Sequence, residues 1–179
     1  MKKYFLLLLL AGTVVMIVVM TKTGASLKTV ATPKGILDLE FAYDSAKAAT
    51  VIAAWQPTSP GAIDNIKVAT HNTYLDFIFL FFYSLFLYFT AKKIAGISGG
   101  GFGKAGRLAY NAALLAGILD VLENAGMLRT LSGSIDGMIA LSTAIFAGIK
   151  WVLALLVVGY CVAGICYVIN IGKLRSLLA

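Results

Sequence analysis

Four apolar runs follow one another along the chain, separated by shorter polar segments. They cover residues 4–20, 74–90, 108–131 and 151–171. A helix needs roughly 17–25 apolar residues to cross the hydrocarbon core of a bilayer, and each run has about that length. The pattern therefore predicts an all-α integral membrane four-helix bundle, with residues 1–179 forming a single membrane domain.

The last apolar stretch is longer than one span requires. From Met138 to Gly172 it would make a helix about 52 Å long at roughly 1.5 Å per residue, whereas about 20 residues suffice for a span. Lys150 and Trp151 are residue types that favour the membrane interface, so we expect a division there. Residues 134–149 would then form a helix on the outer face; the alternative, that they belong to the fourth span, stays open.

The first run has two interpretations. A charged start followed by an apolar stretch is also the pattern of a secretory signal, and Thr23-Gly24-Ala25 is a tolerable cleavage site. The apolar stretch is longer than the roughly 7–15 residues of such signals. We therefore expect an uncleaved first span, with cleavage as the alternative.

Residues 21–72 form the one sizeable segment outside the expected spans, and they contain all three prolines. Asp44 is placed to cap a short helix that ends near Trp55. About 50 residues are too few to build a robust core alone. The segment is therefore expected to lie over the outer end of the bundle as a small helical cap.

The distribution of basic residues predicts the orientation of the chain in the membrane. The short segments on one side of the expected spans carry bases and no acid: Lys2, Lys3, Lys92, Lys93, Lys104, Arg107, Lys173 and Arg175. All eight acids belong to the other half. Because basic loops stay cytoplasmic, both termini are expected in the cytoplasm.

Composition supports a membrane protein and argues against other classes. Hydrophobic residues make up 60% and charged residues 13% of the chain, against about 45–50% and about 25% in soluble domains. The net charge of +7 comes from scattered bases, so no nucleic-acid partner is expected. Cys161 and Cys166 point to different sides of one helix and are interpreted as small packing residues. With a single histidine as well, we expect no metal site and no cofactor.

Three acids fall inside the expected spans, where a carboxylate costs at least about 2.5 kcal/mol at a helix centre. Measured from the bases at the inner helix ends, Asp76 lies about 24 Å along its helix, and Asp120 and Glu123 lie about 20 and 24 Å along theirs. Spans two and three run antiparallel, so all three acids are expected at one depth in the outer leaflet.

These acids predict a polar pocket between spans two and three. Asn124 shares a helix face with Asp120 and Glu123 because positions three and four apart are neighbours. Small residues continue that face, and they allow close helix approach in a membrane; they are Ala113, Ala116 and Gly117. Tyr83 extends the stripe of Asp76, while Arg129 and Lys150 are candidate counter-charges. The alternative is a satisfied polar network that only fixes helix pairing. No nucleophile–base pair accompanies the acids, so no catalytic residue is assigned.

The segment Gly101-Phe-Gly103-Lys-Ala-Gly106 matches G-x-G-x-x-G. A dinucleotide site requires a preceding strand in a βαβ unit, whereas a membrane helix is expected here. We interpret residues 91–106 as a flexible inner turn.

Three stretches together resemble a family of small bacterial multi-spanning membrane proteins without a known function. They are Ile36-Leu-Asp-Leu-Glu-Phe-Ala-Tyr43, Tyr74-Leu-Asp-Phe-Ile-Phe79 and Gly117-Ile-Leu-Asp-Val-Leu-Glu-Asn124. The resemblance covers about residues 36–130. It implies the fold and the bacterial cytoplasmic membrane, and it adds Asp38 and Glu40 to the pocket candidates.

The leading hypothesis is a binding or accessory protein whose outward-facing acidic pocket holds a membrane lipid or another membrane protein. One alternative is a small membrane enzyme or a proton-coupled carrier that uses the intramembrane carboxylates. A purely structural subunit of a membrane complex is the other.

Overall fold

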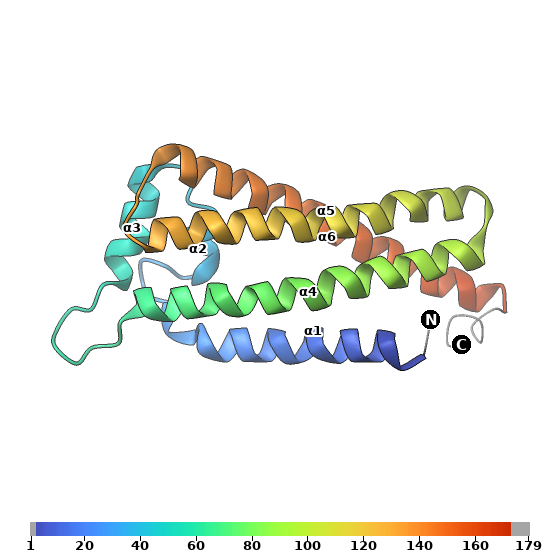
Figure 1. Ribbon diagram of the computed structural model, residues 1–179, viewed down its shortest axis with the longest axis horizontal. Helices are drawn as coiled ribbons and strands as arrows, with labels where there is room; N and C mark the ends of the chain where they lie inside the picture. The colour runs from blue at the N-terminus through green and yellow to red at the C-terminus, as the bar shows by residue number, and fades with distance from the viewer. Residues whose placement is uncertain (1–2, 173–179) are drawn as a thin grey trace.

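Four long helices lie along one another in the computed structural model, which describes residues 3–172 (Figure 1). They are α1 (Lys3–Thr23), α4 (Asn65–Ser98), α5 (Gly100–Leu131) and α6 (Gly137–Asn170). A 3-10 turn, η1 (Ala25–Leu27), and two short helices, α2 (Ile36–Glu40) and α3 (Ser45–Trp55), gather at one end of the bundle. The predicted fold class, a helical bundle with a small helical cap, is confirmed.

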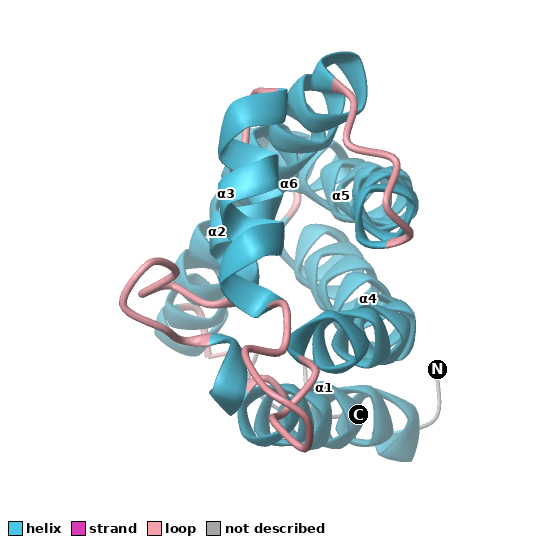
Figure 2. Cartoon of the chain, turned by 90° about the vertical axis from the view of Figure 1, so that its left-hand side faces the viewer, coloured by secondary structure: helices cyan, strands magenta, loops and turns pink. Residues whose placement is uncertain are grey.

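The long helices are arranged as a row that is crossed by the last helix. α4 packs on α1, α5 and α6, and α5 packs on α6, whereas α1 packs mainly on α4. α6 runs obliquely behind the other helices (Figure 1), and α2 and α3 lie over their ends in the end-on view (Figure 2). As a result, α1 and α6 are separated near the cap. The cavity described in the next subsection lies at this end of the bundle.

All four long helices are long and apolar enough to cross a membrane. Their outward faces carry large apolar side chains such as Leu8, Val152 and Leu156. In water this much exposed apolar surface would drive association, whereas lipid solvates it. The protein is a multi-pass membrane protein. The α4–α5 turn lies at the same end of the bundle as the start of α1 and the end of α6 (Figure 1), and this turn is flanked in sequence by Lys92, Lys93, Lys104 and Arg107. Lys2, Lys173 and Arg175 lie outside the described residues.

The expected division at Lys150 and Trp151 is absent. α6 is one helix of 34 residues, about 51 Å long at roughly 1.5 Å per residue, so residues 137–149 continue directly into the fourth span. No proline interrupts this stretch. The charge of Lys150 also needs no membrane interface, because acids inside the bundle surround it, as described below.

The expected flexible turn at 91–106 is also wrong. α4 continues to Ser98 and α5 begins at Gly100, leaving Gly99 alone between them with a φ of 64°. Glycine reaches this left-handed region without strain. Gly101, Gly103 and Gly106 lie in the first turns of α5.

The cap is fixed by a small core of its own that continues into the bundle. Asp44 caps α3 as predicted, its carboxylate accepting from the backbone N–H of Lys47 at 2.7 Å. The fully buried indole of Trp55 donates to the carbonyl of Leu27 at 3.0 Å. Met127 of α5 packs against the same cluster. The cap therefore holds α2 firmly over the helix ends.

The α4–α5 interface depends on small residues, as expected for helices packed in a membrane. Ala113 and Ala116 are fully buried. A Cβ added to Gly117 would lie 2.9 Å from the Cβ of Ser84 on α4. Since that atom is attached directly to the α4 backbone, it cannot move aside without moving the helix.

We expect Gly117→Val to separate α4 from α5 and to lower the free energy of unfolding by about 1–3 kcal/mol, the usual cost of overpacking. Unfolding in mild detergent, followed by circular dichroism, measures this change. Gly159→Val is the matched control, because a Cβ at Gly159 meets nothing within 4 Å. Equal losses in both variants would show that helix propensity, not the interface, decides the result.

Candidate functional site

The ammonium group of Lys150 is the centre of a buried ionic cluster. Its Nζ lies 2.7 Å from Glu123 Oε2 and donates to Asp120 Oδ1 at 3.0 Å. Only 7% of Lys150 is exposed. A lysine placed this deeply in a membrane protein is stable only when it is paired inside the bundle, and two carboxylates on α5 provide that pairing.

The cluster extends from Lys150 to α4. The hydroxyl of Tyr83 donates to Asp120 Oδ2 at 2.7 Å, so both oxygens of Asp120 are engaged. Asn124 Nδ2 donates to Asp76 Oδ2 at 2.7 Å. The antiparallel α4 and α5 therefore bring Asp76, Asp120 and Glu123 to neighbouring positions.

A fourth carboxylate reaches the cluster from the cap. Glu40, the last residue of α2, is buried, and its Oε2 lies 3.8 Å from Lys150 Nζ. The same oxygen accepts a hydrogen bond from Trp151 Nε1 at 3.3 Å. The cap thus contributes directly to a site formed by the membrane helices.

The cluster holds more acid than base. Glu40, Asp120 and Glu123 all lie within 4 Å of the single ammonium group, that of Lys150, and Asp76 lines the same cavity as a fourth carboxyl group. Glu123 Oε1 and Asn124 Oδ1 are buried and have no hydrogen-bond partner among residues 3–172. Buried polar groups are normally satisfied, so the cluster retains unused acceptor capacity.

A cavity of about 410 Å³ adjoins the cluster. This volume lies within the range of about 300–1,000 Å³ that is typical of small-molecule sites. Its charged end is formed by Glu40, Asp76, Asp120 and Lys150. Its remaining wall is mostly apolar and comes from α1, α2, α4 and α6, and it includes Met20, Leu37, Phe79, Phe86, Ala154 and Leu155.

Two of the predicted site residues lie elsewhere. Arg129 is exposed in the last turn of α5 and forms no ion pair with a described residue, so Lys150 alone is the counter-charge. The carboxylate of Asp38 accepts from the backbone N–H of Lys34 at 2.7 Å and stabilises that local turn. The structure brings together the other candidates: Glu40, Asp76, Tyr83, Asp120, Glu123, Asn124 and Lys150.

Sequence reasoning missed the contribution of α1 to the cavity. Thr13 and Met20 line it, but an apolar run gives no sign of which side faces a ligand. Trp151 was recognised only as an interface residue, although it also lines the cavity. The position of Trp151, directly after Lys150, was the one feature of the sequence that could have indicated that this tryptophan lies at the site.

Fold and site together define a multi-pass membrane protein with an ionic cluster beside a largely apolar cavity. Among the described residues, no group of three histidine, cysteine or acidic side chains is arranged to hold a metal ion. Comparisons with protein-family models, with curated proteins and with solved structures found no match.

We expect Lys150→Met to lower the free energy of unfolding by about 3–5 kcal/mol, because it leaves several carboxylates buried without a cation. Adding Glu123→Gln to this variant should cost less than Glu123→Gln costs alone, since the two residues interact. Together with the unmodified protein, the two single variants and the double variant form a double-mutant cycle, and denaturation in detergent measures the free energy of unfolding of all four. Lys67→Met, at an exposed lysine, should leave stability unchanged. Strictly additive effects of Lys150→Met and Glu123→Gln would contradict the pairing.

Proposed function

We propose that this protein binds a membrane lipid whose head group carries an amine. The head group would lie at the charged end of the cavity, and an acyl chain would follow the apolar wall. The observation that supports this proposal is the continuity of one cavity from a cluster with excess acid to a largely apolar wall. An amphiphile matches both parts, whereas a small polar solute matches only one.

The charge at the cavity end favours a cationic group. Lys150 is already enclosed by Glu40, Asp120 and Glu123, so it has little capacity to attract an anion. Asp76 and Glu40 both line the cavity. Each has one carboxylate oxygen without a hydrogen bond to the described residues. An ammonium group would complete these acceptors, and the nearby Trp151 ring offers a cation–π surface.

The apolar wall favours a ligand that enters from the bilayer. Leu155, on α6, lines the cavity and is 64% exposed, and the neighbouring Val158, which also lines it, is exposed as well. The wall is therefore continuous with the surface that acyl chains solvate. A lipid can move sideways into the cavity without transferring its chain through water, which is costly in proportion to the apolar area exposed.

The distribution of acids favours binding over proton transport. All eight acids lie between residues 38 and 136, and none occurs from 77 to 119 or from 137 to 179. A proton relay across a membrane usually needs ionisable groups along its whole length. No chain of acidic residues therefore connects the cluster to the opposite end of the bundle. A carrier or enzyme function has less support than binding for this reason. A docking role for another membrane protein would use the same outer end of the bundle.

We expect a photoactivatable phosphatidylethanolamine, with a diazirine in one acyl chain, to label residues along the cavity wall in nanodiscs. Ala154→Trp fills the cavity and should reduce this labelling at least threefold. Ala163→Trp, the same change at an exposed position of α6, should not. Mass spectrometry of peptides locates the adducts. Labelling that is insensitive to Ala154→Trp would refute the lipid site.

The head group is tested separately. Asp76→Asn should weaken labelling by the ethanolamine lipid, whereas Asp136→Asn should leave it unchanged, because asparagine also caps helices well and Asp136 serves as the N-cap of α6. A phosphatidylglycerol probe with the same chain should label the cavity less. Equal labelling by both probes would leave a lipid site without amine selectivity. A network that only fixes helix pairing predicts no labelling of the cavity at all.

We also infer a bacterial cytoplasmic membrane location, with both termini and the α4–α5 turn in the cytoplasm and the cavity near the outer surface. The support is the four bases at this turn, in a stretch without acids. In a variant lacking Cys161 and Cys166, a membrane-impermeant maleimide applied to intact cells should label Ser59→Cys in the cap. It should not label Ala105→Cys near the turn. The reverse labelling pattern would invert this topology.

A further inference from the structure

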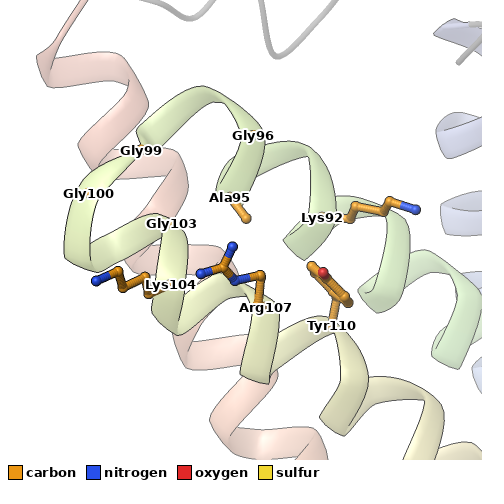
Figure 3. A pocket seen from close by; sticks show the side chains of 9 residues that line it. All are labelled: Lys92, Ala95, Gly96, Gly99, Gly100, Gly103, Lys104, Arg107 and Tyr110. Atoms are coloured by element: carbon orange, nitrogen blue, oxygen red, sulfur yellow. The ribbon is translucent and has the colours of Figure 1, made fainter.

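A second hollow lies at the opposite end of the bundle from the cap. It occupies about 550 Å³ between the last turns of α4 and the first turns of α5, beside the Gly99 connection (Figure 3). It shares no lining residue with the cavity at Lys150. The hollow is therefore a separate site from the cavity at Lys150, and a proposal about it does not rest on the function proposed above.

Three cations line the hollow, and no acid lies near them in sequence. The guanidinium group of Arg107 lies in the gap between α4 and α5, whereas the amino ends of Lys92 and Lys104 point away from it on opposite sides (Figure 3). Residues 77–119 contain no aspartate or glutamate. None of these three side chains forms an ion pair with a described residue. The Lys92 ammonium group donates to the Tyr88 hydroxyl at 3.1 Å, so Arg107 is the cation that faces the gap and is available to an anion, and the two lysines add positive potential around it.

The glycines around the turn keep the hollow open. Gly99 and Gly100 have positive φ values of 64° and 53°, which explains why glycine occurs there. Gly96 has no such reason: it lies within α4, and a Cβ there would meet nothing within 4 Å. Glycine in a helix costs about 1 kcal/mol relative to alanine. At Gly96 its visible effect is to leave the wall of the hollow without a side chain.

The geometry points to a binding site for the phosphate group of an anionic phospholipid. Arginine binds phosphate oxygens through two parallel hydrogen bonds, and lysines add point charges from flexible side chains. The hydroxyl of Tyr110, which also lines the hollow, offers a further donor. Basic pockets between membrane helices are a recurrent type of site for anionic head groups. The exposed Leu108 beside Arg107 provides an apolar surface for the attached chain.

Native mass spectrometry of the full chain in a neutral detergent tests this site with dioleoyl phosphatidylglycerol as the probe. We expect phosphatidylglycerol to bind at least tenfold more tightly than phosphatidylcholine. Arg107→Gln should weaken its binding about tenfold. Arg129→Gln, the same change at the cap end of the same helix, should have no effect. Equal binding by Arg107→Gln and the unmodified protein would overturn the proposal.

A second variant tests the shape of the hollow without removing charge. Gly96→Leu places a side chain on its open wall and should also weaken phosphatidylglycerol binding. Gly148→Leu, at another helix position where a Cβ meets nothing within 4 Å, is its control. If Gly96→Leu and Gly148→Leu bind phosphatidylglycerol equally, the lipid is attracted to the bases in general and the defined site is refuted.

Competition identifies the source of the phosphate group. Inorganic phosphate and glycerol 3-phosphate at millimolar concentration should leave phosphatidylglycerol bound, because they lack the acyl chains. Displacement by either compound at concentrations comparable to the lipid would overturn the assignment to a lipid head group. The site would then be one for a soluble phosphate.

Discussion

The pairing of Lys150 with Asp120 and Glu123 is the constraint on which the arrangement of the bundle depends. A charged group in hydrocarbon has no water to solvate it, so it must find its partner in the protein. Here the ammonium group comes from α6 and its carboxylates from α5, which fixes both the rotation and the height of one helix against the other. Tyr83 and Asn124 extend the same network to α4. Apolar contacts alone would allow these helices to slide or rotate at small cost.

Sequence patterns predicted the long helices and the grouping of the buried acids, but they did not predict that the last helix continues through Lys150. Apolar runs identified the four long helices because length and hydrophobicity are local properties. The common depth of Asp76, Asp120 and Glu123 followed from helical rise alone. The break expected at Lys150 was wrong because its basis was local. A lysine within an apolar run is typical of an interface, and although Lys150 was also a candidate counter-charge, only the fold distinguishes it from Arg129.

Other parts of the site could not be recovered from periodicity. Glu40 lies far from Lys150 in the chain, and its position depends on how the cap settles on the bundle, through Trp55 and Leu27. The separation between α1 and α6, which creates the cavity, arises from the oblique course of α6 across the other helices. Crossing angles are set by many side chains at once. Short motifs carry little information about them.

The order of the paired residues along the chain also has a consequence for biosynthesis. A ribosome makes Asp76, Asp120 and Glu123 before it makes Lys150, so α4 and α5 are synthesised before the cation that pairs with their buried carboxylates. We expect the pairing of these carboxylates to be completed only when α6 has been made, because an unpaired charge is costly in hydrocarbon.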